Sequence, residues 1–566
     1  MRHPLQTLRS YNFDAISRYY RQRPLVVTLR ILNILFTFIG FWLGLQWDNL
    51  QGKGNDPAQV AKRSEQLRCI ITRLGPTYIK VGQALSTRPD LVRVDYLEEL
   101  TKLQDQLPPF SNQEAFAIIE QELGKPVSEI YRAISPSPVA AASLGQVYKA
   151  ELHSGEVVAI KVQRPNLIPI LTLDLYILRT FAEKFGRWLP LNLGHSLAEV
   201  VDEFGTKLFE EIDYINEGRN AEQFANYFRD DPKVKVPAIY WDYTSRRVLT
   251  LEWIDGIKLT DVEKIKAAGL STDDLVRTGV MAGLRQLLEF GFFHADPHPG
   301  NLFATYDGRM AYIDFGMMDQ LSLETKEQLV DAVVYLINRD YEKLGQVYVR
   351  LGFLQPDVDM IPITKALEMV LGDIMTEKVR DFNFKVVTDR FSRIMYDYPF
   401  CLPAKFALII RSVVTQEGVA LTLNPDFKIV QVAYPYVAKR LLTDESESLR
   451  RRLIEVLFKN DRFQWHRLEN LITIARSDGD LDLLPTAHMG LQYLLSPEGQ
   501  FLRSRLLLAL TEDNRLHWEE LQRLWHLLTP ELEPRKLWQI ASKNIPPLAA
   551  QLVTAIPVLA SWQHPA

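Results

Sequence analysis

The sequence predicts an α+β fold of two lobes, with a helical extension before them and an added helical region after them. Residues 145–162 and 247–256 are rich in β-branched and other apolar side chains and are bounded by turn residues, a pattern typical of strands. Most of the remaining chain, including residues 324–440, has the three- to four-residue apolar spacing of helices. Strands and helices therefore fall in separate stretches, as in an α+β fold.

Composition limits the classes of function. The 566 residues suffice for more than one domain, and 24% charged with 47% hydrophobic residues fits a globular protein with some lipid contact. A net charge of -5 supplies no basic field, so we expect no nucleic-acid partner. Cys69 and Cys401 lie outside any CxxC pattern, which excludes a zinc or disulfide scaffold and favours a reducing compartment. We expect no cleavable signal peptide.

Residues 1–50 are predicted to associate with a membrane. Six arginines and one acid occupy residues 1–30, and Leu25–Trp47 carries a single charge, Arg30. That stretch is long enough to cross a bilayer, which needs about 20 apolar residues, or to lie on one. The alternative is a hydrophobic helix docked on the protein's own core. A stripe of small or polar residues suits close contact with another helix: Asn33, Thr37, Gly40 and Gly44.

Residues 51–135 are predicted to form a helical extension. Lys80 and Gln83 are three residues apart, so they share one face of a helix. Gly82 between them lowers helix stability by about 1 kcal/mol relative to Ala, which makes sense where another group packs against the backbone. The spacing alone is equally compatible with an ordinary solvated Lys/Gln face.

Residues 136–260 are predicted to form the strand-rich lobe. Lys161 ends the motif Val158-Ala159-Ile160-Lys161, which is typical of a lysine that binds nucleotide phosphates. An alanine-rich segment stands where a kinase has its glycine-rich loop, and its backbone amides are expected to meet the phosphates: Ala140, Ala141, Ala142 and Ser143. The strand 247–256 is expected to form the hinge, with the backbone of Glu252 and Ile254 meeting adenine.

An acidic cluster lies in residues 197–228, which we predict to be one long helix. Its periodicity places Asp213, Glu217 and Asn220 on one face and Glu211 on another. A kinase needs a helical glutamate to hold the strand lysine, and Glu217 is expected to hold Lys161. Glu211 and Asp213 would then meet another cation, with Lys80 as the candidate. The alternative is a solvated acidic face.

Residues 261–440 are predicted to form the helical lobe and to supply three oxygen-bearing side chains. Asp296 and Asn301 have the Asp-x4-Asn spacing, and Asp314 begins an Asp-Phe-Gly motif thirteen residues later. A hairpin through the turn 306–308 would place Asp314 beside Asn301. In a kinase-type site Asp296 would lie near the attacking oxygen, and Asn301 and Asp314 would bind the metal. Chance co-occurrence of the two motifs is the alternative.

These motifs resemble the UbiB/ADCK family of atypical kinases over roughly residues 60–440. The resemblance is carried by Lys80-Val81-Gly82-Gln83, Ser86-Thr87-Arg88-Pro89-Asp90, the alanine-rich segment, Lys161, Glu211-Ile212-Asp213 with Glu217, the loop His294–Asn301, and Asp314-Phe315-Gly316. The set is specific because the Lys-x-Gly-Gln helix is combined with an alanine-rich loop.

The resemblance implies a two-lobed protein-kinase-like fold that binds ATP with Mg²⁺ or Mn²⁺. It implies that the Lys80–Gln83 extension folds over the active site and obstructs protein substrates, so Lys80 and Gln83 join Lys161, Glu217 and Asp296 as expected catalytic residues. It also implies membrane association, with the catalytic domain on the cytoplasmic or equivalent side. The expected role is ATPase activity that supports prenylquinone or isoprenoid-lipid biosynthesis, with a lipid or quinone precursor and quinone-biosynthesis proteins as partners.

Two other functions remain open from the sequence. One is a nucleotide-responsive membrane scaffold with little turnover, which the alanine-rich loop and the obstructing extension would suit. The other is a protein or small-molecule kinase, which the absence of an Ala-Pro-Glu motif after Gly316 disfavours for peptide substrates. Residues 441–566 are predicted to be an added, mainly helical region whose apolar end, 545–562, would contact a membrane or a partner.

Overall fold

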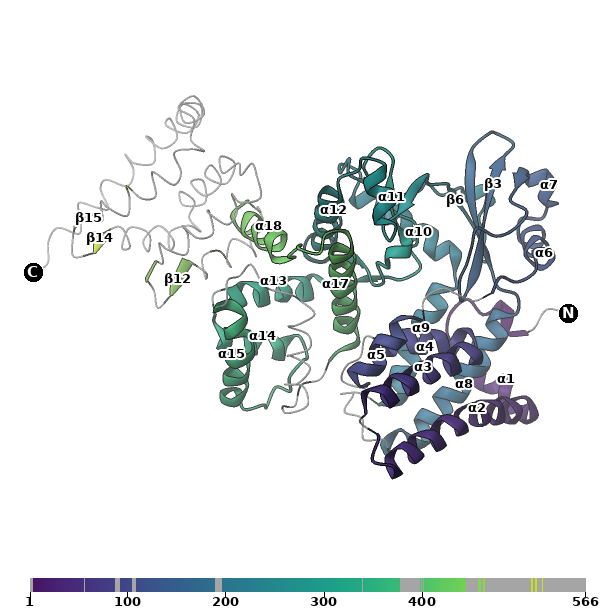
Figure 1. Cartoon of the computed structure of the whole chain (residues 1–566), viewed down its shortest axis with the longest axis horizontal. Helices are drawn as coiled ribbons and strands as arrows, with labels where there is room; N and C mark the ends of the chain where they lie inside the picture. Colours follow the sequence, from purple (N-terminus) through teal and green to yellow (C-terminus); the bar gives the residue numbers. More distant parts are fainter. Residues whose placement is uncertain are drawn as a thin grey trace, which may run out of the picture. The chain divides into compact units, whose positions relative to one another are not determined.

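The computed structural model of the chain is shown in Figure 1. It describes residues 4–54, 56–86, 92–103, 108–188, 196–337, 339–376 and 402–443, with Tyr398, Phe400 and a few short pieces beyond 450. The chain divides into two compact units, the first formed by residues 1–332 and 339–427 and the second by residues 333–338 and 428–566. The candidate site lies in the first unit.

The strand-rich lobe is built on an antiparallel sheet with the strand order β1-β3-β4-β6, and β2 pairs with β3 at its edge. Its elements are α6 (Asn112–Leu123), α7 (Val127–Ile130), β1 (Tyr131–Ile134), β2 (Ala140–Ala141), β3 (Gly145–Leu152), β4 (Val157–Gln163) and β6 (Val248–Glu252). Val158, Ile160 and Val162 on β4 pack into one apolar cluster with α6. Because side chains alternate along a strand, Lys161 points to the opposite face, which α10 (Tyr214–Tyr227) covers.

The helical lobe contains a four-stranded sheet with the order β5-β10-β9-β7 and a two-stranded pair of β8 with β11. Its strands are β5 (Val234–Lys235), β7 (Gly256–Lys258), β8 (Phe292–His294), β9 (Leu302–Thr305), β10 (Met310–Tyr312) and β11 (Met318–Gln320). Its helices are α11 (Val262–Ala267), α12 (Thr272–Leu284), α13 (Leu323–Ile337), α14 (Tyr341–Arg350), α15 (Met360–Thr376) and α17 (Ala404–Leu423). The predicted hairpin is present as β9 and β10, and Ser271 is the N-cap of α12.

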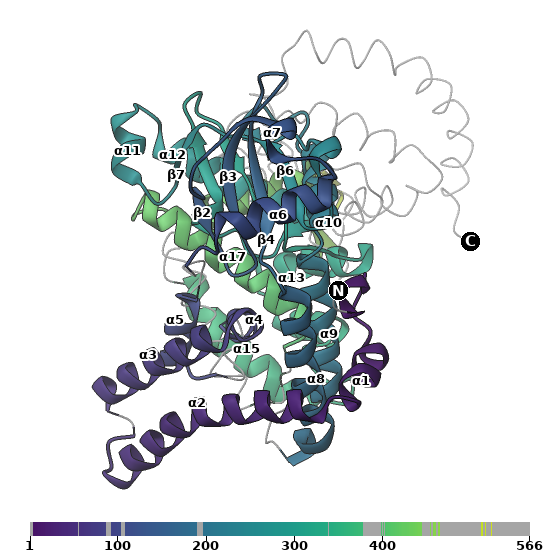
Figure 2. The ribbon, with the colours of Figure 1, turned by 90° about the vertical axis from the view of Figure 1, so that its right-hand side faces the viewer.

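The N-terminal helices pack beside the two long helices that follow β4 (Figure 2). These elements are α1 (Phe13–Arg21), α2 (Pro24–Leu50), α3 (Pro57–Leu74), α4 (Pro76–Leu85), α5 (Val94–Thr101), α8 (Leu167–Phe185) and α9 (Leu197–Glu211). Gly82 on α4 has the close neighbours that its position suggested, since a Cβ there would meet the side chains of Leu103 and Ile71. Residues 87–91, which complete one of the motifs, lie outside the described residues.

The prediction of one helix over 197–228 is wrong. The chain forms two helices, α9 and α10, which are separated at Ile212 and Asp213. Asp213 has extended backbone angles, and its side chain accepts a hydrogen bond from the Ile215 amide as the N-cap of α10. The apolar periodicity continues across this break, but aspartate is among the best N-cap residues and here it starts a new helix.

The small-residue stripe of α2 lies close to another helix at Gly44 but not at Gly40. A Cβ at Gly40 would meet nothing within 4 Å, and a Cβ at Gly44 would meet the guanidinium group of Arg63. The Thr37 hydroxyl donates to the Asn33 carbonyl oxygen of its own helix (2.7 Å). The stripe therefore borders the contact with α3 through a side chain.

Two described helices, α2 and α17, are long and apolar enough to cross a membrane. Half of the apolar window of α17 is buried inside the protein, whereas none of the window of α2 is. The second unit contributes α18 (Val430–Thr443) and short strand pairs: β12 (Phe458–Lys459) with β13 (Arg462–Phe463), and β14 (Thr511–Glu512) with β15 (Arg515–Leu516). The expected boundary at residue 440 falls inside α18, and residues 545–562 lie outside the described residues.

Candidate functional site

Lys161 and Glu217 form the centre of a buried polar cluster between the lobes. The Lys161 Nζ lies 2.7 Å from Oε1 and 2.9 Å from Oε2 of Glu217, and 3.6 Å from Oδ1 of Asp314. The Glu217 side chain is only 2% exposed. The pairing of the strand lysine with Glu217, rather than with Glu211 or Asp213, is the one that the sequence indicated.

Burial and opposite charge act against one another in this cluster. Burial raises the pKa of Glu217 to about 7, although Lys161 lowers it. Burial by itself would lower the pKa of Lys161, but Asp314 and Glu217 raise it well above its ordinary value. We therefore take Lys161 as a cation, and its position suits a group that must contact phosphate oxygens.

The hairpin β9–β10 brings Asn301 and Asp314 together. The Asn301 Nδ2 donates to Asp314 Oδ2 (3.3 Å), and the Gly316 amide donates to Asp314 Oδ1 (3.0 Å). Burial would raise the pKa of Asp314, but the Lys161 charge and the Gly316 amide hold it well below its ordinary value. An ionised carboxylate beside an amide oxygen is a donor set that Mg²⁺ accepts when phosphate oxygens and water supply the other ligands.

The described residues contain no cluster of three or more His, Cys, Asp or Glu side chains with metal-site geometry. The two side chains expected to bind a metal, Asn301 and Asp314, are the ones that lie together. Gly316 allows this packing, because a Cβ there would contact Asp314 Oδ1 at 3.3 Å, Glu211 Cγ at 3.6 Å and Glu217 Oε2 at 3.8 Å.

His294 connects the loop that bears Asp296 to the strand end that bears Asp314. Its Nδ1 accepts a hydrogen bond from the Asp296 amide (3.1 Å), so its Nε2 carries the proton and donates to the Asp314 carbonyl oxygen (2.8 Å). The Gln286 Oε1 accepts from the His294 amide (2.9 Å). Burial lowers the pKa of His294, which keeps the ring neutral in this role. The sequence contained this histidine as part of a motif but gave it no role.

Arg411 on α17 forms an ion pair with Oδ2 of Asp296. The two side chains are 7% and 16% exposed. The second carboxylate oxygen, Oδ1, is buried without a hydrogen-bond partner among the described residues. Sequence reasoning missed this contact; its only signal was an arginine within a largely apolar helix, which usually requires a buried partner.

Lys80 and Glu211 form the second ion pair of the cluster. Both side chains are nearly buried, at 12% and 13% exposed. Burial raises the pKa of Glu211 and the Lys80 charge lowers it, with a net increase. The break between α9 and α10 explains why Glu211 and Glu217 both reach the cluster although one continuous helix would separate them. Asp213 pairs instead with Arg246 (3.2 Å).

Gln83 is held inside the helical extension. Its Nε2 donates to the Leu103 carbonyl oxygen (3.0 Å), and its Oε1 is buried without a partner among the described residues. The structure therefore brings Lys80 into the cluster, whereas the contacts of Gln83 are to the extension itself.

The alanine-rich segment forms a tight turn between β2 and β3. Ala140 and Ala141 pair with Val147 and Gln146, and the Ala142 amide donates to the Gly145 carbonyl oxygen (2.8 Å). A Cβ at Gly145 would lie 2.6 Å from the Val162 carbonyl oxygen and against the Tyr214 hydroxyl. The Lys161 Nζ lies 5.3 Å from the Tyr214 ring centroid, so the turn and the lysine share this tyrosine as a neighbour. Ser143 within the turn is 3% exposed.

The expected hinge residues connect the two sheets. The Glu252 carboxylate accepts hydrogen bonds from Lys235 Nζ (2.7 and 2.8 Å) and from the Ala238 amide (3.1 Å). The Trp253 amide donates to the Val157 carbonyl oxygen (3.1 Å). The Glu252 carboxylate thereby links β6 of one lobe to Lys235 on β5 of the other. Ile254 lies in the segment between β6 and β7.

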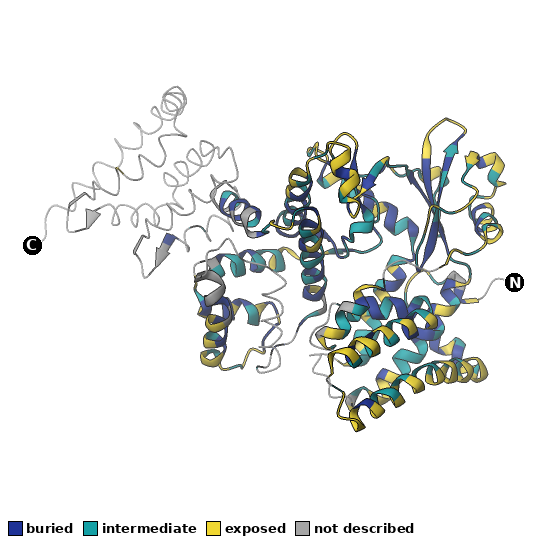
Figure 3. Ribbon diagram, viewed as in Figure 1, coloured by how far each residue is buried: buried dark blue, intermediate teal, exposed yellow. Residues whose placement is uncertain are grey.

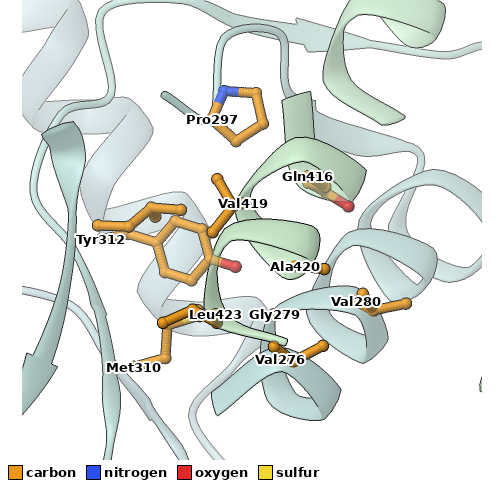
Figure 4. Close-up of a pocket in the computed structure, with 11 residues that line it drawn as sticks. Val276, Gly279, Val280, Pro297, Met310, Tyr312, Gln416, Val419, Ala420 and Leu423 are labelled. Atoms are coloured by element: carbon orange, nitrogen blue, oxygen red, sulfur yellow. The ribbon is translucent and has the colours of Figure 1, made fainter. Parts of the chain in front are cut away.

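A small apolar pocket lies next to the loop that bears Asp296 (Figure 4). It is bordered by α12, α17 and the β9–β10 hairpin. Pro297, Tyr312 and Val419 line it, and Gln416 is its polar neighbour. None of Lys161, Glu217, Asn301 and Asp314 lines this pocket, so it is separate from the polar cluster.

Comparison with known proteins places the chain in a family. The profile of the ABC1 atypical kinase-like domain matches residues 102–348. An uncharacterized protein of Synechocystis sp. is 63% identical over 95% of this chain and 94% of its own length. The Protein ACTIVITY OF BC1 COMPLEX KINASE 1, chloroplastic, of Arabidopsis thaliana is 47% identical over 97% of this chain and 81% of its own. The solved structure of the Rv3197–erythromycin complex from Mycobacterium tuberculosis is 26% identical and covers 61% of this chain and 87% of that one, with a TM-score of 0.43.

A two-lobed α+β fold, a buried Lys161–Glu217 pair beside Asp314, and relatives that match nearly the whole chain all agree. The chain therefore belongs to the family of ABC1 atypical kinase-like proteins.

Proposed function

We propose that this protein is a membrane-associated ATPase of the atypical kinase type that supports prenylquinone or isoprenoid-lipid biosynthesis. The observation that supports catalysis is the convergence of Lys161, Glu217 and Asp314 within hydrogen-bond or ion-pair distance, with Asn301 bonded to Asp314. Groups from a strand, a helix and a hairpin meet there although they are distant in sequence. Such a constellation is the minimum for positioning a metal–triphosphate.

Each residue has a role that its contacts support. Lys161, oriented by Glu217, would bind phosphate oxygens, and the backbone amides of Ala140–Ser143 would contact them from the turn. The backbone of Glu252 and Ile254 would meet adenine. Asn301 and Asp314 would hold Mg²⁺ or Mn²⁺, which neutralises charge on the phosphates when bound. Asp296 would lie near the attacking oxygen.

The acceptor is proposed to be water or a small lipid-linked molecule rather than a peptide. β11 begins two residues after Gly316 and leads directly into α13, so the chain has little length there for a peptide-binding platform. Lys80 on the helical extension meets Glu211 at the same cluster. These two features support an acceptor that approaches through a restricted opening.

A second candidate is a nucleotide-responsive membrane scaffold with little turnover. The Arg411–Asp296 ion pair favours it, because one carboxylate oxygen of Asp296 already contacts a nearly buried guanidinium group and is not available to an attacking nucleophile. In that function ATP binding would change the arrangement of the helical extension without rapid hydrolysis.

Phosphate release by the purified full chain, with liposomes and a quinone-like phenol, distinguishes the two functions. We expect Mg²⁺-dependent release that Asp314→Asn abolishes and that Asp307→Asn, on the exposed β9–β10 turn, leaves intact. Asp307 is a suitable control because it carries the same change at the other end of the same hairpin and bonds only locally to Thr305 and Arg309. Equal release by wild type and Asp314→Asn would remove the enzymatic function. ATP-dependent thermal stabilisation without release would favour the scaffold.

The proposed link to lipids has a separate test. The exposed apolar surface of α2 and the arginines before it support membrane association on the cytoplasmic or equivalent side. Quinone and lipid profiling of cells that lack the protein should show an altered prenylquinone pool, restored by the wild type and not by Asp314→Asn. An unchanged profile would remove the biosynthetic role while leaving the ATPase intact.

A further inference from the structure

The outer face of α2 is an unusually long exposed apolar surface. Along its 27 residues, large side chains at intervals of three, four or seven positions are 54–82% exposed. Those on the central line of this face are Leu25, Leu29, Phe36, Leu43, Trp47 and Leu50. Figure 3 shows the exposed colour along most of this helix. A helix of this length is about 40 Å long. The exposed apolar surface along it is therefore far larger than that of the single apolar residues that are scattered over an ordinary monomer.

The inner face of the same helix is fixed to the rest of the unit. Arg30 Nε and Nη2 donate to the two carboxylate oxygens of Asp174 (2.8 and 3.0 Å), and Nη2 also donates to the Leu74 carbonyl oxygen (2.7 Å). Asp174 is fully buried. Near the other end, Arg63 Nε donates to Asp48 Oδ2 (2.6 Å).

Apolar contacts lie between these two ion pairs. Ile34, Phe38 and Phe41 pack against the buried cluster that α3, α4 and α5 form, and Leu178 of α8 joins them. Asp174 and Leu178 lie on the face of α8 that meets α2, and Phe181 and Phe185 continue that face. These two rings are 50% and 41% exposed. The end of α8 therefore exposes two further aromatic rings.

A bilayer-spanning α2 conflicts with this arrangement. Crossing would withdraw Arg30 and Asp48 from their partners and would leave Asp174 as a buried carboxylate without a counter-ion. It would also uncover the cluster beneath Ile34, Phe38 and Phe41. Loss of one partner from a buried ion pair is strongly destabilising, whereas lying at an interface keeps every one of these contacts.

Basic residues lie at both ends of the apolar face. Arg18 and Arg21 are exposed before α2, and Lys53 and Lys62 are exposed after it. Together with Arg23 they outnumber the acids Asp14 and Asp56 of the same stretches, whereas Arg63 pairs with Asp48 and adds no net charge. Trp42 and Trp47, 57% and 62% exposed, have the amphipathic rings that favour the headgroup level.

This distribution of charge indicates which partner covers the apolar face of α2. If two copies paired through α2, cations would face cations whether the helices ran parallel or antiparallel, because both ends are basic. An anionic lipid surface complements both ends at once.

We propose that α2 lies in the plane of an anionic lipid surface, with its outer face in the acyl boundary and its inner face docked on the domain, and does not cross the bilayer. This inference rests on the proposed membrane association and specifies its geometry.

Flotation of the full chain with vesicles tests the surface. Binding should be strong to phosphatidylcholine mixed with phosphatidylglycerol and weaker to phosphatidylcholine alone. The double variant Leu29→Gln/Phe36→Gln should lower the partition coefficient by about ten- to a hundredfold or more, because each side chain would leave the acyl boundary. Ala117→Gln, at an exposed position of α6, is the matched control and should bind like the wild type. Equal binding by the double variant, or self-association through α2 without vesicle binding, would overturn the proposal.

Cysteine labelling tests the geometry. The variants carry Cys69→Ser and Cys401→Ser and one new cysteine each, at Gln22 or at Gln51, which are exposed positions on either side of α2. After the protein has bound to sealed vesicles, each variant is treated with an impermeant maleimide. Labelling of both positions supports the in-plane arrangement. Protection of one position until detergent is added would show a spanning helix, overturning this inference but not membrane association or ATP hydrolysis. Phosphate release from the same samples reports on the proposed function separately.

Discussion

The ion pair between Arg411 and Asp296 predicts that removing one charge destabilises the protein and that removing both restores most of the stability. Arg411→Met removes the guanidinium group but keeps an apolar stem, so the Asp296 carboxylate stays 16% exposed with neither oxygen paired among the described residues. Breaking one side of a buried ion pair costs about 3–5 kcal/mol. At the usual entropy of unfolding per residue, for a unit that spans residues 1–332 and 339–427, this loss corresponds to a fall of roughly 3–6 °C in the unfolding temperature.

Removing both charges should reverse most of the loss. In Arg411→Met/Asp296→Asn no unpaired charge is left at this contact, so its unfolding temperature should lie above that of Arg411→Met alone. Arg411→Lys should be intermediate, because an ammonium keeps the charge but not the guanidinium geometry. Differential scanning calorimetry of the wild type, Arg411→Met, Asp296→Asn and the double variant measures the coupling directly, and Arg411→Lys is compared with them.

An exposed ion pair provides the control for the magnitude of the destabilisation. Arg132, whose side chain is 68% exposed, pairs with Glu151 on the strand-rich lobe, and Arg132→Met should cost less than about 1 kcal/mol. The reasoning is refuted if the double variant is no more stable than Arg411→Met, or if Arg411→Met costs no more than Arg132→Met. Either result would mean that Asp296 does not depend on this partner.

Two further predictions concern the turn and the histidine of the site. Gly145→Ala should destabilise the protein by about 1–3 kcal/mol in thermal unfolding, because its Cβ would press on the Val162 carbonyl oxygen. The control is Gly40→Ala, where a Cβ meets nothing within 4 Å and the change should be neutral or stabilising by up to about 1 kcal/mol. Equal effects of the two substitutions would contradict the packing at the turn. Burial lowers the pKa of His294 below its ordinary 6.5, so the unfolded chain binds more protons just below that pH and stability should fall as pH drops through about 6.5. His294→Gln should reduce this slope by up to about 1.4 kcal/mol per pH unit, and an unchanged slope would show that the ring is protonated in the folded state.

Much of the site was predictable because it rests on local patterns. The strand–turn–strand pattern placed Lys161 on a buried strand, and a buried lysine requires a carboxylate partner, which the acidic helix supplied as Glu217. The turn at 306–308 between two apolar runs was sufficient to predict the hairpin that joins Asn301 to Asp314. In each case the interaction follows from the period of a strand or from the chemistry of a turn.

Other parts of the site depended on a helix cap and on long-range contacts, which a periodic pattern does not reveal. The apolar spacing runs on through Ile212, yet Asp213 caps a new helix and thereby turns both Glu211 and Glu217 toward the cluster. Arg411 lies more than a hundred residues from Asp296, and no local pattern relates them. The same limit applies to Gln83, whose expected position over the site is not accompanied by a contact to it among the described residues.

The sequence by itself determined the order of strands and helices, the identity of the polar groups at the site and the presence of a long apolar helix near the N-terminus, because these follow from side-chain chemistry and spacing. Only the tertiary structure decided that Arg411 meets Asp296, that Lys80 meets Glu211 rather than Asp213, and which face of α2 is covered. Those outcomes depend on the free energy of burying charge, and a charge can be buried only where another part of the chain brings its counter-ion.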